Sequence, residues 1–327
     1  MKIKILSTVI VLSISVNILY TQQLPNYSQY TFNRFLINPS YAGAEGYTVA
    51  SFVAREQWVG IKEAPRTHAL MIQSRILPQS YVPQDASVRK RSRKLSRSGR
   101  VGWGGYAFND RNGLMDRTGF KGTYSYHIDV WGGQISFGLS GMMYQLKVDH
   151  ERFVTEDPTV QDNLLEGIKK PLYIPDADFG ISYLTREYYL GYSVNQILQS
   201  SVQFGQKGEG NYRLKRHHNL MGGYRYIIDD DWAVIPSFWV KIPEGSKAQL
   251  DLSVRGTYKD VYWGGLSFKT GSSLTIFGGA NVDRYYFGYA FDYNFNSLMG
   301  YTFGSHEIML SVKFGDNARR YKWLNTY

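Results

Sequence analysis

The stretch "HEIMLSVKFG", residues 306–315, alternates between two kinds of side chain. One side holds the apolar residues Ile308, Leu310, Val312 and Phe314. The other side holds Glu307, Met309, Ser311 and Lys313. Successive side chains of a β-strand point to opposite faces, so this period of two predicts a strand with one apolar and one wet face.

The same alternation recurs in earlier parts of the chain. Clear cases are "QISFGLSGMMY" (134–144), "AQLDLSVRGTY" (248–258), "SLTIFGGANV" (273–282) and "YYFGYAFDY" (285–293). A soluble β-sandwich would alternate too, so the polar face has to decide between the two folds. Here that face carries glycine, serine and opposite charges, while the apolar face ends in aromatic residues. This combination is typical of the polar lumen and aromatic girdles of an outer-membrane barrel, and the sandwich remains the alternative.

About fourteen segments of this kind follow one another between residues 46 and 314. They lie near 46–56, 66–77, 100–110, 118–127, 133–147, 177–186, 188–198, 214–228, 232–242, 248–258, 261–269, 273–283, 285–295 and 306–314. The number is even, as a closed single-chain barrel usually requires, and closure leaves no strand edge unpaired in lipid. We therefore predict an all-β fold, a transmembrane outer-membrane antiparallel β-barrel of about 14 strands.

The two ends of the chain have their own organisation. Residues 1–21 combine two lysines with a short apolar run and a polar exit, which predicts a secretory signal peptide, with an uncleaved anchor as the alternative. Residues 22–45 precede the first strand, and we expect them either to plug the lumen or to line its rim. Residues 315–327 follow the last strand as an expected periplasmic tail. The absence of cysteine excludes disulfides and thiol chemistry.

The connections between the expected strands differ in length according to parity. Tight connections follow strands 4, 6, 8, 10 and 12, and longer ones follow strands 1, 3, 5, 7, 9 and 13. Bacterial barrels have short periplasmic turns and longer outer loops. The first strand is therefore expected to run outward, with both termini in the periplasm.

The loop after strand 2, residues 78–99, is the long exception on the periplasmic side. It contains most of "VRKRSRKLSRSGR" (88–100), with Arg89, Lys90, Arg91, Arg93 and Lys94 at its centre. The formal charge of the whole chain is +10, and removal of Lys2 and Lys4 with the signal peptide leaves +8, of which this run supplies seven. Because the surplus charge is local and the chain is exported, nucleic acid is not an expected partner. The run is interpreted either as a solvated loop or as a contact with acidic groups in the periplasm.

Candidate chemistry is sparse in this sequence. His217 and His218 are adjacent, so a strand would point them to opposite faces and they could not share a metal. His127 and Asp129 are candidates for an orienting pair, and a polar lumen network is the alternative interpretation. The glycine-rich pieces lack the pattern of a phosphate loop. We expect no enzyme activity, no metal and no cofactor.

Several motifs in order carry a family resemblance. They are "YSQYTFNRFLINPSYAGAEG" (27–46), "REQWVGIKEAPRTHAL" (55–70), "GYAFNDRNGLMDRTG" (105–119), "IDDDWAVIPSFWVK" (228–241), "YKDVYWGGLSF" (258–268), "YYFGYAFDY" (285–293) and "GSHEIMLSVKF" (304–314). Through them the chain resembles the PorP/SprF family of type IX secretion outer-membrane proteins over its length up to Phe314. The sequence departs from the family pattern at residues 78–99, where relatives typically have a short turn.

The resemblance implies a Bacteroidota outer-membrane protein that serves type IX secretion. Some members of this family help the C-terminal domain of one secreted adhesin to reach and stay on the cell surface, as in gliding motility. Others belong to the core machinery, next to a periplasmic lipoprotein that binds peptidoglycan. A passive porin is the third possibility.

Candidate partner-binding residues lie in three places. They are Asn33, Asn38, Pro39 and Gly43 before the first strand; Gln57, Trp58, Gly60 and Pro65 in the next connection; and Arg89, Lys90, Arg91, Arg93 and Lys94 in the basic loop. For Asn38-Pro39 and Ala42-Gly43, turns that lead the chain into strand 1 are the alternative to a binding role.

Overall fold

The computed structural model describes residues 27–76, 100–149, 171–204, 210–295 and 300–314. The signal peptide, the basic loop and the tail of the sequence analysis lie outside these residues. No helix in the described part of the chain is long and apolar enough to cross a membrane.

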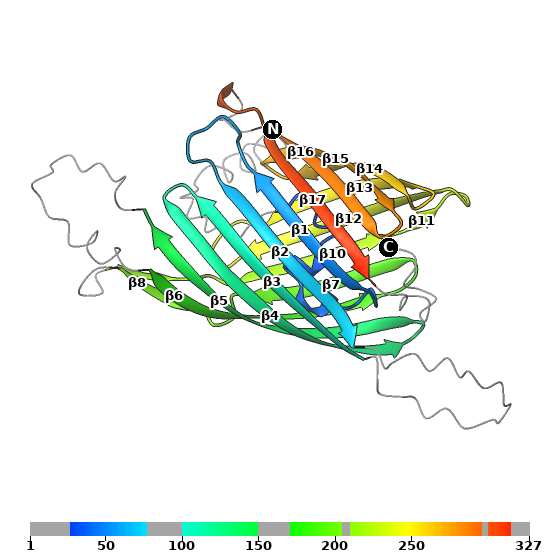
Figure 1. Cartoon of the computed structure of the whole chain (residues 1–327), viewed down its shortest axis with the longest axis horizontal. Coiled ribbons are helices and arrows are strands. Elements are labelled where there is room, and N and C mark those ends of the chain that lie inside the picture. The colour runs from blue at the N-terminus through cyan, green and yellow to red at the C-terminus, as the bar shows by residue number, and fades with distance from the viewer. Residues whose placement is uncertain (1–26, 77–99, 150–170, 205–209, 296–299, 315–327) are drawn as a thin grey trace, which may run out of the picture.

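Fourteen strands of the described chain form one antiparallel barrel (Figure 1). They are β1 (Thr48–Glu56), β2 (Arg66–Ile76), β3 (Val101–Asn112), β4 (Met115–Val130), β5 (Gly133–Val148), β6 (Leu172–Leu184), β7 (Tyr188–Asn195), β10 (His217–Tyr224), β12 (Trp232–Pro243), β13 (Gln249–Tyr258), β14 (Tyr262–Lys269), β15 (Ser273–Val282), β16 (Tyr285–Asn294) and β17 (Ser305–Phe314). The barrel closes because β1 pairs with β17 along its whole length, side by side in Figure 1. The predicted fold class and strand number are confirmed.

The face that each side chain takes decides between barrel and sandwich. Ile308, Leu310 and Phe314 of β17 are 41%, 46% and 48% exposed, whereas Glu307, next to Ile308, is 1% exposed. A soluble sandwich would bury the apolar set and expose the carboxylate. The apolar face points outward, as a lipid-facing surface must, and the polar face points into the lumen.

The structure corrects three details of the connections. β3 and β4 extend beyond the expected segments and meet in a two-residue turn at Gly113, whose φ is +60°, where a longer connection was expected. The segment expected at 214–228 is split into β10 and the short β11 (Tyr226–Ile227). The connection after β7 contains an additional hairpin of β8 (Ser201–Phe204) and β9 (Gly210–Arg213). Each error arose in a segment rich in polar residues. In such a segment the alternating pattern continues beyond the expected strand or stops before its expected end.

The barrel has two ends, which we name after the strands that turn there. At the β1–β2 end, β1 ends and β2 begins. At the β4–β5 end, β4 ends and β5 begins. The first residue of β1 and the last residue of β17 lie at this end too. The unplaced basic loop joins β2 to β3 and so leaves from the β4–β5 end.

The segment before β1 lies inside the barrel. Every residue from Tyr27 to Ala44 is buried except the half-buried Phe32. The segment includes a single helical turn, α2 (Arg34–Ile37), and the 3-10 turn η1 (Pro39–Tyr41). It bonds to opposite walls, since Ser28 donates to Asp292 of β16 at 2.8 Å and Ser40 donates to Ser182 of β6 at 2.8 Å. The lumen is therefore occupied by the chain's own N-terminal segment.

Glycines on the inner wall make room for this segment. A Cβ atom on Gly138 of β5 would lie 2.2 Å from the carbonyl carbon of Pro39, and one on Gly180 of β6 would lie 2.0 Å from Asn38 Oδ1. Neither position could carry a side chain without moving the segment. Glycine within these strands marks a close backbone approach.

Candidate functional site

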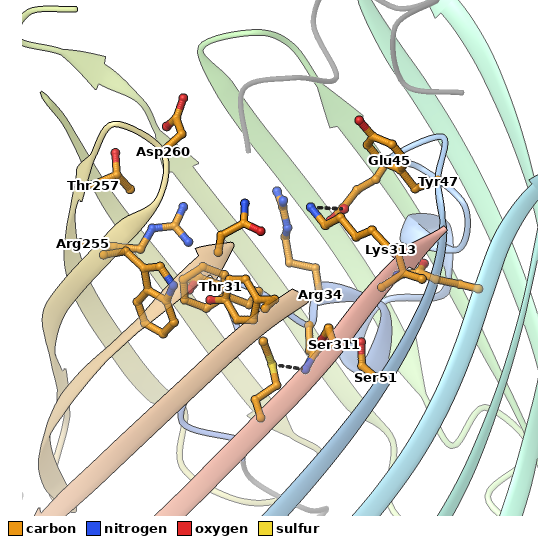
Figure 2. A pocket seen from close by; sticks show the side chains of 18 of the residues that line it. Thr31, Arg34, Glu45, Tyr47, Ser51, Arg255, Thr257, Asp260, Ser311 and Lys313 are labelled. Atoms are coloured by element: carbon orange, nitrogen blue, oxygen red, sulfur yellow. Dashed lines mark hydrogen bonds and ion pairs between the residues drawn. The ribbon is translucent and has the colours of Figure 1, made fainter. Parts of the chain in front are cut away.

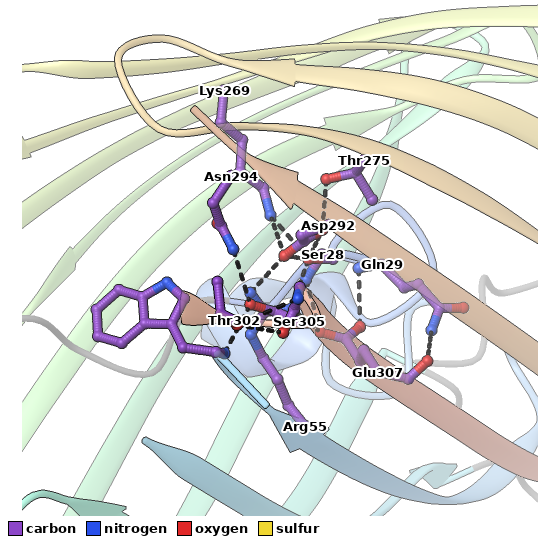
Figure 3. A network of polar contacts seen from close by, with 12 residues as sticks. Ser28, Gln29, Arg55, Lys269, Thr275, Asp292, Asn294, Thr302, Ser305 and Glu307 are labelled. Atoms are coloured by element: carbon purple, nitrogen blue, oxygen red, sulfur yellow. Dashed lines mark hydrogen bonds and ion pairs between the residues drawn. The ribbon is translucent and has the colours of Figure 1, made fainter. Parts of the chain in front are cut away.

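A buried ion network ties the N-terminal segment to the wall near the β1–β2 end (Figure 3). Arg55 of β1 contacts Asp292 of β16 at 2.5 Å and Glu307 of β17 at 3.2 Å. Lys269 of β14 contacts the same Asp292 at 3.3 Å. All four side chains are almost fully buried, and the two positive charges balance the two negative charges. The lumen can hold these charges only because they are paired and hydrogen-bonded.

Ser28 lies at the centre of this network. Its hydroxyl bonds to Asp292 and accepts from Arg55 at 2.6 Å and from Lys269 at 2.7 Å. The Glu307 carboxylate accepts the backbone N–H groups of Ser28 at 2.7 Å and Gln29 at 2.9 Å. Charge-assisted bonds of this kind are the stronger ones. The network thus fixes the position of the chain at residues 28–29.

Two tyrosines of the segment lie beside this network. Tyr27 contacts the hydroxyl of Tyr106 at 3.3 Å, and Tyr30 packs against Trp239 with ring centroids 5.0 Å apart. Burial raises the pKa of both phenols well above the usual value, so both remain protonated hydrogen-bonding groups.

The "NPSYAG" part of the segment is packed against the wall on the other side of the lumen. The Asn38 amide donates to the carbonyls of Ile181 and Tyr192, each at 3.2 Å, and its oxygen accepts from Ser40 N at 3.0 Å. Gly43 has a φ of +67°, and a Cβ there would lie 2.5 Å from the Ser74 carbonyl oxygen. Pro39 starts η1 and is buried. These residues place the chain within the barrel, and none of the three reaches the surface.

Asn33 faces a different part of the lumen. It is buried, donates to the sulfur of Met309, and lines a cavity at the β4–β5 end. Of the four candidates in the N-terminal segment, Asn33 is the one that lines this cavity.

The four candidates in the β1–β2 connection form part of a rim. Val59 makes two backbone hydrogen bonds across two connections: Val59 N donates to Gly304 O at 2.9 Å, and Phe303 N donates to Val59 O at 2.8 Å. Trp58 N donates to Ser305 Oγ at 3.1 Å, and Gly60, with a φ of +103°, lies against the Phe303 ring. Gln57 N donates to the carbonyl of the buried Pro65 at 2.8 Å. The structure brings these four residues together above the ion network.

The third candidate set is not placed. Arg89, Lys90, Arg91, Arg93 and Lys94 lie outside the described residues.

The cavity that Asn33 lines opens at the β4–β5 end of the lumen (Figure 2). It is a cavity of about 290 Å³ between residues 31–34 and the walls formed by β13, β16 and β17. Arg34 and Arg255 both extend into it. The lumen therefore has a tightly packed charged end and an open cationic end.

The whole-chain comparison agrees with this architecture. The sequence matches the family model described as "Type IX secretion system membrane protein PorP/SprF" over residues 19–312. The chain belongs to the PorP/SprF family. No curated protein sequence matches.

Solved structures similar to this PorP/SprF chain are distant. They include the toluene transporter TbuX of Ralstonia pickettii, at 10% identity and a TM-score of 0.48, covering 86% of this chain and 93% of that one. The TodX ΔS2S3 mutant monoaromatic hydrocarbon channel has 11% identity and a TM-score of 0.45, with coverage of 86% and 93%. BamA from Haemophilus ducreyi lacking POTRA domains 1–3 has 8% identity and a TM-score of 0.39, with coverage of 82% and 70%. No function is transferred from any of them.

The histidines of this PorP/SprF barrel have structural partners. His127 bonds through Nδ1 to Ser136 at 2.8 Å and through Nε2 to the Ala42 carbonyl at 3.0 Å, whereas the Asp129 side chain is exposed. The proposed His127–Asp129 pair is thus replaced by a network that holds the N-terminal segment. His217 faces the lumen, and His218 bonds to Tyr192 outside it. No group of three or more metal-ligating side chains occurs among the residues that the structure describes.

Sequence reasoning missed the ion network and Arg255. Arg55, Asp292 and Glu307 each lie at an inward position of an alternating strand, which was the available signal. Alternation does not reveal that residues 252 positions apart, such as Arg55 and Glu307, are paired across the closure of the barrel.

Proposed function

We propose that this PorP/SprF protein is a non-enzymatic outer-membrane anchor of type IX secretion, which holds a secreted adhesin through the adhesin's C-terminal domain. The observation that carries the proposal is the occupied lumen. A barrel filled by its own N-terminal segment from Tyr27 to Ala44 offers its ends as working surfaces. Loops on a rigid barrel are suitable sites for binding a partner.

The rim at the β1–β2 end is the proposed adhesin-binding surface. Its two connections are held together by backbone hydrogen bonds and carry exposed apolar side chains, including Tyr301 and Phe303. Exposed aromatic residues on a fixed backbone are common anchors of protein interfaces. Trp58 and Gly60 belong to the same rim.

This proposal requires the β1–β2 end to face the outside of the cell. Three of the longest connections leave from that end: 149–171, 196–216 and 295–304. The chain has no cysteine, so labelling of a single introduced cysteine shows which side of the membrane that position faces. Lys62→Cys, at the β1–β2 end, should react with a membrane-impermeant maleimide on intact cells, and Arg186→Cys, in the β6–β7 turn, should react only after lysis. The reverse pattern would contradict the orientation.

The adhesin role is tested by deletion of the gene followed by complementation. One surface protein should be missing from the cell surface or released into the medium, while other type IX cargo is exported normally. Complementation with Trp58→Ala/Phe303→Ala should restore the barrel to the membrane but not that surface protein, and Tyr226→Ala, an exposed aromatic change at the opposite end, should restore both. Loss of all cargo would contradict the adhesin role.

The second candidate is a core component of the machinery that couples the outer membrane to a periplasmic lipoprotein or to peptidoglycan. The basic loop at the β4–β5 end favours it, because each Lys or Arg near an anionic surface contributes up to about 1 kcal/mol. Replacing the five central basic residues by serine should abolish export of all cargo if this role is correct. Unchanged export would leave the adhesin proposal standing and remove this one.

A further inference from the structure

The cavity at the β4–β5 end contains an unusual cation. Arg255 of β13 is 6% exposed, and no hydrogen bond or ion pair joins its guanidinium to any residue in the described part of the chain. Its described contact is with the ring of Phe32, 4.3 Å from the guanidinium carbon to the ring centroid. Removing a charge from water without an opposite charge is costly, so this position calls for a partner.

The other charged groups of the cavity do not supply that partner. Arg225 is paired with Asp260 at 2.7 Å, and Lys313 lies 3.6 Å from Glu45. The groups that act on the charge of Arg255 are the phenols of Tyr286 and Tyr189 and, after them, two further cations, Arg34 and Arg225. The interior of the cavity is therefore positive, and the carboxylates at its mouth are occupied by other cations.

Figure 2 shows how the cations enter the space. Arg255 extends from the wall at β13 and Arg34 from the N-terminal segment, with their guanidinium groups in the cavity. A planar guanidinium matches the two oxygens of a carboxylate or phosphate. An oxyanion in this cavity would lie next to Arg255 and within the positive potential of Arg34.

The rest of the wall limits what such a ligand can be. Phe32 packs on Trp263 at 4.1 Å and on Tyr286 at 4.8 Å between ring centroids, and all three line the cavity. Its volume of about 290 Å³ is at the lower limit for small-molecule sites. An aromatic wall and a small volume favour a small organic anion with one charged group.

We infer that the cavity at the β4–β5 end is a binding site for a small organic oxyanion, whose carboxylate or phosphate group is held by Arg255. This site is separate from the proposed adhesin-binding rim, which lies at the other end of the barrel. Arg255 supplies the ion pair, Arg34 adds positive potential, and the aromatic wall contacts the organic part.

The test is calorimetric titration of the full-length chain in detergent. Benzoate and phenyl phosphate are the probes, and benzyl alcohol is the neutral control. One equivalent of at least one anion should bind saturably in the millimolar range or better, and benzyl alcohol should not bind. A preference between the two anions identifies the charged group as carboxylate or phosphate.

Variants locate the binding. Arg255→Gln should weaken anion binding by at least about tenfold, as expected for loss of a charge-assisted bidentate contact. Arg117→Gln is the matched control: Arg117 pairs with Asp110 at 2.5 Å near the β1–β2 end, so binding should equal that of the wild type. Folding is checked by the heat-dependent shift of the barrel band on a denaturing gel. If Arg255→Gln does not fold, Arg255→Lys provides the comparison, with intermediate affinity expected.

Three results would overturn the inference. They are the absence of saturable binding of both anions to the folded wild type, equal binding of benzyl alcohol, and unchanged affinity in the folded Arg255 variant. Each of these leaves the adhesin proposal unaffected, because that proposal depends on the opposite end of the barrel.

Discussion

The guanidinium of Arg55 joins the first strand of the barrel to its last two strands and to the N-terminal segment. It donates to Ser28, Asp292 and Glu307 within one buried cluster. Removal of one member of a buried ion network leaves the others uncompensated, which costs more than the net stabilisation that the intact network provides.

We predict that Arg55→Met lowers the free energy of unfolding by about 3–5 kcal/mol, since two buried carboxylates lose their main partner. Urea unfolding in detergent micelles measures this change. The control is Lys259→Met: Lys259 and Asp231 are 3.8 Å apart and half exposed, so this change should cost less than about 1 kcal/mol. Equal destabilisation by both variants would show that the buried network has no special role.

Glycine at position 138 provides a second residue-level test. Gly138→Ala would place a methyl group 2.2 Å from Pro39, and the expected loss of stability is about 1–3 kcal/mol for overpacking. Gly141→Ala on the same strand meets nothing within 4 Å and should change stability by no more than about 0.5 kcal/mol. Thermal unfolding of the two variants side by side checks the difference; a neutral Gly138→Ala would mean that the segment does not press on β5.

At the scale of elements, the N-terminal segment and the barrel wall depend on each other. The segment runs from the ion network near the β1–β2 end to Gly43, beside Ser74, at the β4–β5 end. Polar wall residues on β4, β6, β7, β13, β16 and β17 find partners on the segment. Without it, these inward groups would face water instead, as in an open pore.

We predict that deletion of residues 22–45 opens the barrel. The intact protein should show no steady conductance in planar bilayers, whereas the deletion variant should conduct ions through the emptied lumen. Deletion of 315–327, which leaves the segment in place, is the control and should not conduct. Equal conductance of the intact and deletion proteins would support a passive porin instead.

The whole molecule inverts the usual distribution of polarity. Large apolar side chains of the described strands cover the outside, and polar and charged side chains lie inside together with aromatic and methionine residues. This distribution is stable only where lipid or detergent covers the outer surface. The depth of a lipid-facing residue in the bilayer then determines the free-energy cost of a charged substitution at that position.

We predict that Leu310→Arg, at the middle of β17, destabilises the barrel by about 2–4 kcal/mol in lipid vesicles. Phe314→Arg, at the end of the same strand, should cost only about 0–1 kcal/mol because the arginine can reach the interface. Urea titration of vesicle-embedded protein compares the two. If the costs were reversed, the membrane would not be centred on the middle of β17.

Much of the fold was predictable because its signal is local. Alternation along "HEIMLSVKFG" determines which side chains share a face, and fourteen such segments determine the strand number. The sequence motifs also placed the chain in its family. Errors were confined to the ends of strands, such as Gly113 and the 196–216 connection, where the alternating signal is weakest.

The candidate site was less predictable. "NPSYAG" and "EQWVGIKEAP" were recognised as motifs, but the burial of Asn38 against β6 and β7 and the pairing of Val59 with Phe303 are properties of the folded barrel. The sequence indicated which charged residues face inward on each strand, but not which of them form ion pairs.

By itself the sequence determined the strands, their two faces and the barrel class, because a period of two is a property of neighbouring residues. Only the tertiary structure decided that Arg55, Lys269, Asp292 and Glu307 meet at Ser28, that residues 27–44 occupy the lumen, and that Arg255 lies in a cavity without an acidic partner among the described residues. These features depend on strand register around a closed sheet. Closure brings together residues far apart in the chain, and no local pattern records which ones meet.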